Sequence, residues 1–130
     1  MIYLDTSALV KLVFEEAESE ALERWLVERD DSPKVTSELS TIELLRACRR
    51  VDEGAMTAAR QVLAGLDLLP MTGELVGRAA VVDPAELRSL DAIHLASALM
   101  LTGTLEAFVA YDTRLGMAAR DAGLEVAAPA

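Results

Sequence analysis

Two hydrophobic patterns alternate along the chain: short apolar runs, and longer segments whose apolar positions recur at helical spacing. The runs predict buried strands and the longer segments predict amphipathic helices. Strands are predicted over residues 2–4, 34–36, 107–110 and 124–126. Helices are predicted over residues 8–16, 17–29, 37–51, 56–66, 75–82, 91–101 and 115–122. Because strands alternate with helices, we expect an α/β fold: a three-layer α/β/α sandwich with a central parallel sheet, formed by residues 1–130 as a single domain.

The predicted helices differ in how much of their surface is apolar. Residues 37–51 are amphipathic, with Leu44, Cys48 and Val51 on one stripe. Residues 91–101 are apolar almost all round, which is typical of a helix in the interior. We therefore expect this later helix to be central to the core.

Composition narrows the kind of core and the compartment. Apolar residues make up 52% of the 130 residues and aromatic residues only 4%, so the core is expected to be aliphatic. Cys48 is the only cysteine and is expected to be a buried thiol in a reducing compartment. No apolar run reaches the roughly 18 residues that a membrane span needs, and the N-terminus lacks the pattern of a signal peptide. These features predict a cytoplasmic protein with no membrane partner.

The net charge of −10 argues at first against a nucleic-acid partner, because phosphate binding usually needs a basic surface. The charge is uneven, however. Residues 32–62 carry 4 acidic and 5 basic side chains, whereas residues 1–31 carry 9 and 3 and residues 63–130 carry 9 and 4. An acidic protein can also approach a polyanion if divalent cations neutralise its site.

Four carboxylates occupy positions at which chemistry is expected. Asp5 and Asp112 each follow a predicted strand, and the carboxyl ends of parallel strands line the crevice where α/β proteins bind ligands. Glu43 lies on the helix after the second strand, and Asp91 is near the start of the apolar helix.

Each carboxylate also has a purely structural interpretation. Asp5 and Asp112 are suited to capping helix N-termini. Glu43 lies three residues after Ser40, the spacing of a capping box, although that would need a helix starting at Ser40. Asp91 is suited to the first turn of a helix, where the helix dipole favours an acid.

Taken together, the carboxylates favour a metal site. A partly buried Asp91 is costly unless it is paired or coordinated, and the chain has 12 basic against 22 acidic side chains. Several carboxylates in one crevice would repel, and a divalent ion removes that conflict. A ligand set made only of oxygen atoms selects Mg²⁺ or Mn²⁺ rather than zinc.

Four sequence blocks, in order, resemble the PIN domain of VapC-type toxins, the ribonucleases of VapBC toxin–antitoxin systems. The similarity spans residues 2 to 115, and residues 54–87 carry no family signature. The blocks are MIYLDTSALVKL at the N-terminus, SELSTIELLRA from Ser37, LDAIHLASA from Leu90 and YDTRL from Tyr111.

The resemblance implies an endoribonuclease that depends on Mg²⁺ or Mn²⁺ and directs water onto a backbone phosphate, leaving a 5′-phosphate and a 3′-hydroxyl. It implies that Asp5, Asp91 and Asp112 bind the metal, with Glu43 completing the shell or orienting the water. It also implies a small antitoxin with a basic segment as partner, and a homodimer formed through the first helices.

Other polar side chains are candidates for contacts with RNA. Ser7 and Thr113 are placed to bind metal waters or a substrate phosphate, or else to cap helices. His94, the only histidine, is more simply explained as a packed, hydrogen-bonded side chain than as an acid–base group. The candidate phosphate contacts, which could equally be solvated, are Arg46, Arg49, Arg50 and Arg114.

Other classes of protein fit less well. A phosphate-accepting receiver domain would need a late strand-end lysine, and the only lysines are Lys11 and Lys34. A haloacid dehalogenase-type phosphatase would need aspartate where this chain has Ser7. The remaining alternative is a non-catalytic PIN-like interaction module, against which the four intact acids count. The sequence does not identify the RNA that is cut.

Overall fold

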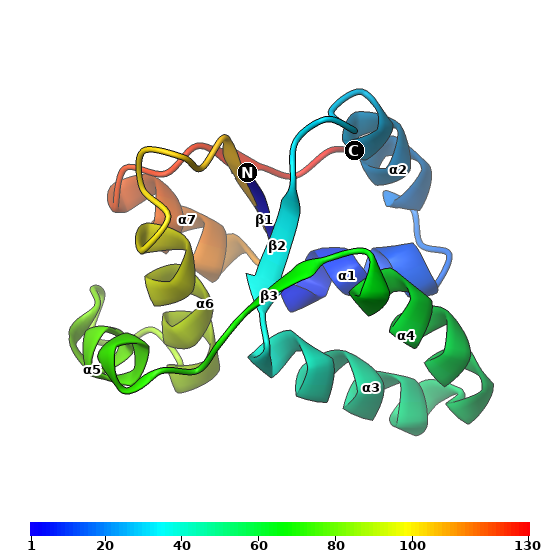
Figure 1. The fold of residues 1–130 in the computed structure, drawn as a ribbon, viewed down its shortest axis with the longest axis horizontal. Helices are drawn as coiled ribbons and strands as arrows, with labels where there is room; N and C mark the ends of the chain where they lie inside the picture. Colours follow the sequence, from blue (N-terminus) through cyan, green and yellow to red (C-terminus); the bar gives the residue numbers. More distant parts are fainter.

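The computed structural model describes all 130 residues and has a five-stranded sheet with helices on both faces (Figure 1). Every strand pairs in parallel with its neighbours, in the order β3-β2-β1-β4-β5. The predicted α/β/α sandwich with a central parallel sheet is confirmed. The strands are β1 (Ile2–Leu4), β2 (Lys34–Ser37), β3 (Asp67–Leu69), β4 (Ala107–Val109) and β5 (Val126–Ala127).

The helices divide between the two faces of the sheet (Figure 1). One side carries α1 (Thr6–Val13), α2 (Ser19–Val27), α3 (Leu39–Val51) and α4 (Met56–Ala64), with a 3₁₀ turn (Glu53–Ala55) before α4. The other side carries α5 (Gly73–Val81), α6 (Ser89–Leu99) and α7 (Thr113–Asp121).

Strand β1 shows how the sheet separates two cores. Ile2 and Leu4 pack into the cluster beneath α1 to α4, whereas Tyr3 packs into the cluster on the α6 and α7 side. The ring of Tyr3 stacks on Phe108 of β4, with 5.3 Å between centroids. All three residues of β1 are fully buried, because a central parallel strand is covered on both faces.

The order of the strands reverses its direction between β1 and β4. From β1 the chain moves through β2 to β3 on one side, then returns to place β4 on the other side of β1. In open α/β sheets, the crevice that binds ligands is found at such a reversal, outside the carboxyl ends of the two strands. The backbone N–H of Asp5 donates to the carbonyl of Val109 at 3.1 Å, so the two strand ends are directly joined.

Some boundaries differ from those predicted. The first predicted helix stops at Val13, because the buried hydroxyl of Ser19 binds the carbonyls of Lys11 and Phe14 and accepts from the N–H of Glu16. This compact turn separates α1 from α2, whereas the prediction placed the two helices directly one after the other.

One apolar position and one strand differ from the prediction. Val51 was predicted to share the stripe of Leu44 and Cys48, but it is the last residue of α3 and is 73% exposed. Strand β3 was not predicted, because only two of its three residues are apolar and it lies at the edge of the sheet, paired with β2 alone.

The central helix and the free thiol were predicted correctly. Six of the eleven residues of α6 are buried, and Cys48 is an unpaired, buried thiol. None of the helices has the length and apolar character that crossing a membrane requires.

Candidate active site

Asp5 is a buried carboxylate at the end of β1, with only 4% of its surface exposed. It caps α1 by accepting from the backbone N–H of Ala8 at 3.3 Å, so the alternative structural role of Asp5 is confirmed. Burial raises the pKa of Asp5 to about 6, and the charge of Asp91 acts in the same direction, while the Ser7 hydrogen bond and His94 oppose them. Asp5 therefore carries a negative charge that the protein alone does not fully compensate.

Ser7 holds Asp5 from one side. Its Oγ donates to Oδ1 of Asp5 at 2.5 Å and accepts from the backbone N–H of Tyr111 at 2.9 Å. The hydroxyl proton of Ser7, which was considered as a donor to a phosphate or a metal water, is thus already directed at Asp5. In this geometry Ser7 positions the carboxylate.

Glu43 receives two hydrogen bonds on the same oxygen. Oε1 accepts from Oγ1 of Thr6 at 2.7 Å and lies 2.7 Å from Nε2 of His94. Burial acts to raise the pKa of Glu43, but the bonds from His94 and Thr6 outweigh it, so the pKa lies below its usual value. Glu43 is therefore a stable carboxylate at neutral pH.

The capping-box interpretation of Ser40 and Glu43 is not realised. Helix α3 begins at Leu39, and its cap residue, Glu38, makes no side-chain cap bond. Ser40 is buried and pairs with Thr36 Oγ1 at 2.6 Å. Glu43 is thus free of a capping role.

His94 is packed and hydrogen-bonded, as predicted, with 2% of its surface exposed. Its Nδ1 lies 2.7 Å from the hydroxyl of Tyr3, and its Nε2 contacts Glu43. Sequence reasoning missed that Tyr3 and Thr6 belong to this group. The available signal was a tyrosine hydroxyl in a buried strand and a histidine on an apolar helix, since both need polar partners.

Asp91 lies in the first turn of α6 and Asp112 at the start of α7. Asp112 caps α7 by accepting from the N–H of Leu115 at 2.9 Å, so this alternative role is confirmed. Burial, and then the charge of Asp112, raise the pKa of Asp91, against the opposing effect of Arg88. Arg88 lies 3.8 Å from Asp91 Oδ2 and 4.0 Å from Asp112 Oδ2. Because its side chain is 72% exposed, this pairing is weak.

The four acids interact electrostatically, but they do not surround a single metal position. The pKa of Asp91 is raised by both Asp112 and Glu43, and that of Asp5 by Asp91. However, no three His, Cys, Asp or Glu side chains lie close enough to surround a metal ion together. Mg²⁺ keeps several of its waters and is usually bound through one or two carboxylates. The oxygen-only donors and their uncompensated charge therefore fit a hydrated divalent ion.

The remaining candidate contacts fall into two places. Thr113 and Arg114 are exposed at the start of α7, and Arg114 lines a hollow of about 390 Å³ together with Asp91 and Arg88. A separate hollow on α3 is lined only by three exposed arginines, none of which forms an ion pair: Arg46, Arg49 and Arg50.

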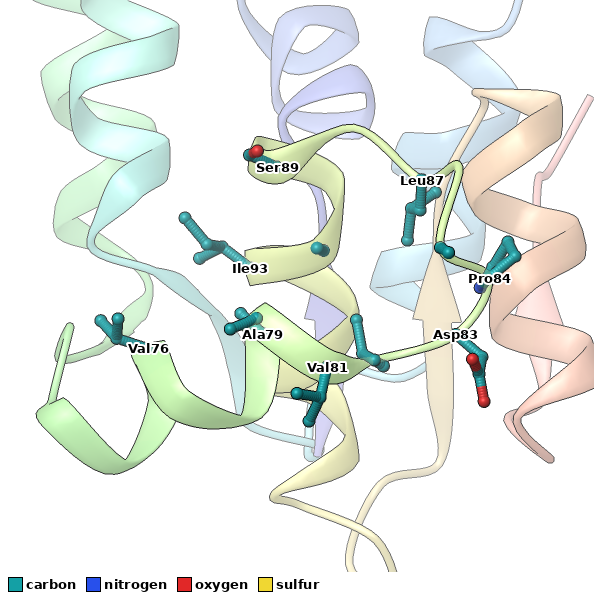
Figure 2. Close-up of a pocket in the computed structure, with 12 residues that line it drawn as sticks. Val76, Ala79, Val81, Asp83, Pro84, Leu87, Ser89 and Ile93 are labelled. Carbon is teal, nitrogen blue, oxygen red and sulfur yellow. The ribbon is translucent and has the colours of Figure 1, made fainter.

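A larger hollow, of about 450 Å³, lies between α5, α6 and the segment that connects them (Figure 2). It is lined mainly by apolar side chains, among them Val76, Ala79 and Ile93, and contains none of the four acids. Its lining suits an apolar group and has no arrangement of carboxylates for a metal.

Known proteins resemble this chain over almost its whole length. A model of the PIN domain family matches residues 2–121. Ribonuclease VapC47 of Mycobacterium tuberculosis is 45% identical over 99% of this chain and 97% of its own length. Ribonuclease VapC46 of the same species is 45% identical over 98% and 97%, and ribonuclease VapC35 is 46% identical over 99% and 97%.

The fold also matches a solved structure. The crystal structure of Mycobacterium tuberculosis VapC20, described as a sarcin-ricin loop cleaving toxin, superposes with a TM-score of 0.73 over 95% of this chain and 96% of that one. At 22% identity this likeness concerns the fold alone. On the family match and the near-full-length relatives, this chain belongs to the PIN-domain family, in its VapC ribonuclease group.

Proposed function

We propose that this chain is a divalent-metal-dependent endoribonuclease that acts as the toxin of a toxin–antitoxin pair in the cytoplasm. The observation that carries the proposal is a pair of interacting carboxylates with raised pKa values: Asp5, which is buried after β1, and Asp91, which is partly buried in the first turn of α6. Acidic side chains whose charge the protein does not compensate are typical of functional sites, and they attract cations. The names of relatives that are 45–46% identical support ribonuclease activity.

Asp5, Asp91 and Asp112 would hold Mg²⁺ or Mn²⁺, directly or through its waters. A bound divalent ion would polarise the phosphoryl oxygens and lower the pKa of the attacking water. The protein's own part is to keep these carboxylates in place: Ser7 orients Asp5, and the cap bond to Leu115 orients Asp112.

Glu43 would orient the attacking water. Its lowered pKa keeps it ionised, and an ionised carboxylate accepts hydrogen bonds from water. Both of its protein donors go to Oε1, so Oε2 keeps its acceptor capacity for water. The proposed reaction leaves a 5′-phosphate and a 3′-hydroxyl.

The RNA backbone would be held by side chains on both sides of the crevice. Arg114, at the start of α7, lines the same hollow as Asp91 of α6, and Thr113 precedes it in the sequence. The second group lies on α3, one to two turns after Glu43, and its unpaired guanidinium groups suit phosphates. It consists of Arg46, Arg49 and Arg50.

A small antitoxin with a basic segment is the proposed protein partner. The net charge of −10 and the acids at the crevice favour a cationic side chain over the site. We also propose that two copies of the chain form a homodimer through their first helices. Sedimentation of the purified protein would measure the mass of the assembly and so test whether it is a dimer.

The decisive experiment incubates purified protein with total RNA and Mg²⁺ or Mn²⁺, then maps the new ends. Defined cuts that disappear with chelator and in Asp5→Asn and Asp91→Asn are expected. Asp31→Asn, an exposed acid outside the site, is the matched control and should cut normally. If folded wild-type protein leaves all RNA intact with either metal, the ribonuclease proposal fails and the interaction-module alternative gains support.

A further inference from the structure

Three side chains form a continuous polar chain through the interior, from the sheet to the candidate site. Tyr3 of β1 contacts His94 of α6, and His94 contacts Glu43 of α3. The two contacts are 2.7 Å each and join residues that are 91 and 51 positions apart in the sequence. Each polar group in this series needs a hydrogen-bond partner, because the groups lie in a largely apolar interior.

The direction of the last hydrogen bond follows from its geometry. Oε1 of Glu43 already accepts the hydroxyl proton of Thr6, and a carboxylate oxygen accepts where an imidazole N–H donates, so the proton of the 2.7 Å contact lies on Nε2 of His94. Nδ1 on the other side of the ring is engaged by the hydroxyl of Tyr3. The series of contacts thus leads from the Tyr3 hydroxyl through the ring of His94, and its Nε2–H donates to Oε1 of Glu43.

His94 cannot reach an RNA substrate itself. Only 2% of its surface is exposed, and both ring nitrogens are engaged by protein groups. The rings of His94 and Tyr3 also make an edge-to-face contact, with 5.9 Å between centroids. A side chain with this burial acts on the reaction only through the groups that it holds.

We propose that His94 is a positioning residue of the ribonuclease. Together with Tyr3, which contacts its Nδ1, and Thr6, which also donates to Glu43, it fixes the rotamer of Glu43 so that Oε1 is anchored and Oε2 can accept from water. This inference rests on the proposed ribonuclease function. It assigns a task to the only histidine, to a buried tyrosine hydroxyl and to the threonine that follows Asp5.

The kinetic test compares variants that differ only in the donor offered to Glu43. His94→Leu removes both ring nitrogens while keeping an apolar helix former at the position. His94→Gln keeps an N–H donor for Glu43. Loss of a hydrogen-bond partner behind an active-site group typically lowers activity by about 10- to 100-fold. We expect a kcat loss in that range for His94→Leu with little change in KM, and recovery of most of it in His94→Gln.

Further variants test the contributions of Thr6 and Tyr3 separately from that of His94. Thr6→Val should lower kcat and Thr6→Ser should retain it, because only the serine keeps a hydroxyl for Glu43. Tyr3→Phe keeps the stack on Phe108 and should lower kcat less than His94→Leu. Ser19→Ala removes a buried hydroxyl that contacts none of the site residues and controls for stability: it should lower the melting temperature without changing kcat.

A spectroscopic test needs no RNA, so it separates this inference from the ribonuclease proposal. Because the chain has a single histidine, its imidazole ¹⁵N signals are unambiguous in NMR. We expect a proton on Nε2 in the wild type and a changed Nε2 signal in Glu43→Gln. A bare Nε2, or folded His94→Leu protein with wild-type kcat, would overturn the positioning role. If the wild type cuts no RNA, the proposed function fails, and the NMR result still decides whether His94 holds Glu43.

Discussion

The hydroxyl of Ser7 accepts a hydrogen bond from the backbone N–H of Tyr111 at 2.9 Å, across 104 positions of sequence. This contact joins the start of α1 to the segment that follows β4, and the same hydroxyl donates to Asp5. Asp5, which follows β1, is therefore held through Ser7 by the segment that leads from β4 to Asp112. One small side chain couples the two strand ends on which the candidate site is built.

Ser7→Ala should lower both stability and activity. It leaves the partly buried N–H of Tyr111 without its partner, which costs at most about 1–3 kcal/mol, the range for fully buried donors, and it frees Asp5 to rotate. Urea unfolding and kcat on a cleavable RNA would measure the two effects. Thr104→Ala, which removes a hydroxyl from an exposed turn, is the control and should change neither. A Ser7→Ala protein with normal kcat would show that Asp5 needs no such alignment.

Asp5→Asn should stabilise the metal-free protein at neutral pH. The pKa of Asp5 is about 6 in the folded state, above its ordinary value of 3.8, so folding favours the protonated form. The destabilisation is absent below pH 4, grows between pH 4 and 6 and is complete above that range; the shift corresponds to at most roughly 3 kcal/mol.

Melting temperatures measured with chelator at pH 4 and pH 7.5 would test this. Asn keeps an oxygen for Ala8 and Ser7, so the variant should gain over the wild type at pH 7.5 and show little difference at pH 4. An equal difference at both pH values would contradict a strained, ionised Asp5.

Two substitutions of Asp112 should separate its charge from its capping role. Asp112→Asn keeps an N-cap side chain for Leu115, so stability should be nearly unchanged while the affinity for Mn²⁺ falls. Asp112→Ala should lose the cap as well, at a cost of about 1 kcal/mol. Calorimetric titration with Mn²⁺ and thermal melting measure the two properties separately. Unchanged Mn²⁺ affinity in both variants would remove Asp112 from the metal site.

The arginines of α3 should act on RNA binding. Replacing Arg46, Arg49 and Arg50 by Gln should raise KM and flatten the salt dependence of RNA binding, by about 0.7 in the logarithmic slope for each phosphate that is no longer neutralised. Arg24→Gln and Arg78→Gln are matched controls, since both are exposed helix arginines paired with a glutamate one turn away. If the triple variant binds RNA with the wild-type salt slope, these arginines do not bind the RNA backbone.

Local sequence patterns anticipated much of the fold. The apolar runs at 2–4 and 107–110 became β1 and β4 because a buried parallel strand is apolar on both faces, a property that each segment carries by itself. Strand β3 escaped prediction because it lies at the sheet edge with Asp67 and Leu68 exposed, and pairing with β2 rather than its own pattern defines it.

By itself, the sequence determined the alternating elements and the acids that follow the strands, and it offered the caps of Asp5 and Asp112 as one interpretation, because these features depend on neighbours within a turn or two. Only the tertiary structure decided what Glu43 and His94 do. Their hydrogen bond joins α3 and α6 across the interior, and its length and burial depend on how the helices pack on the sheet. A buried polar group must find partners, but which ones it finds is a property of the assembled core.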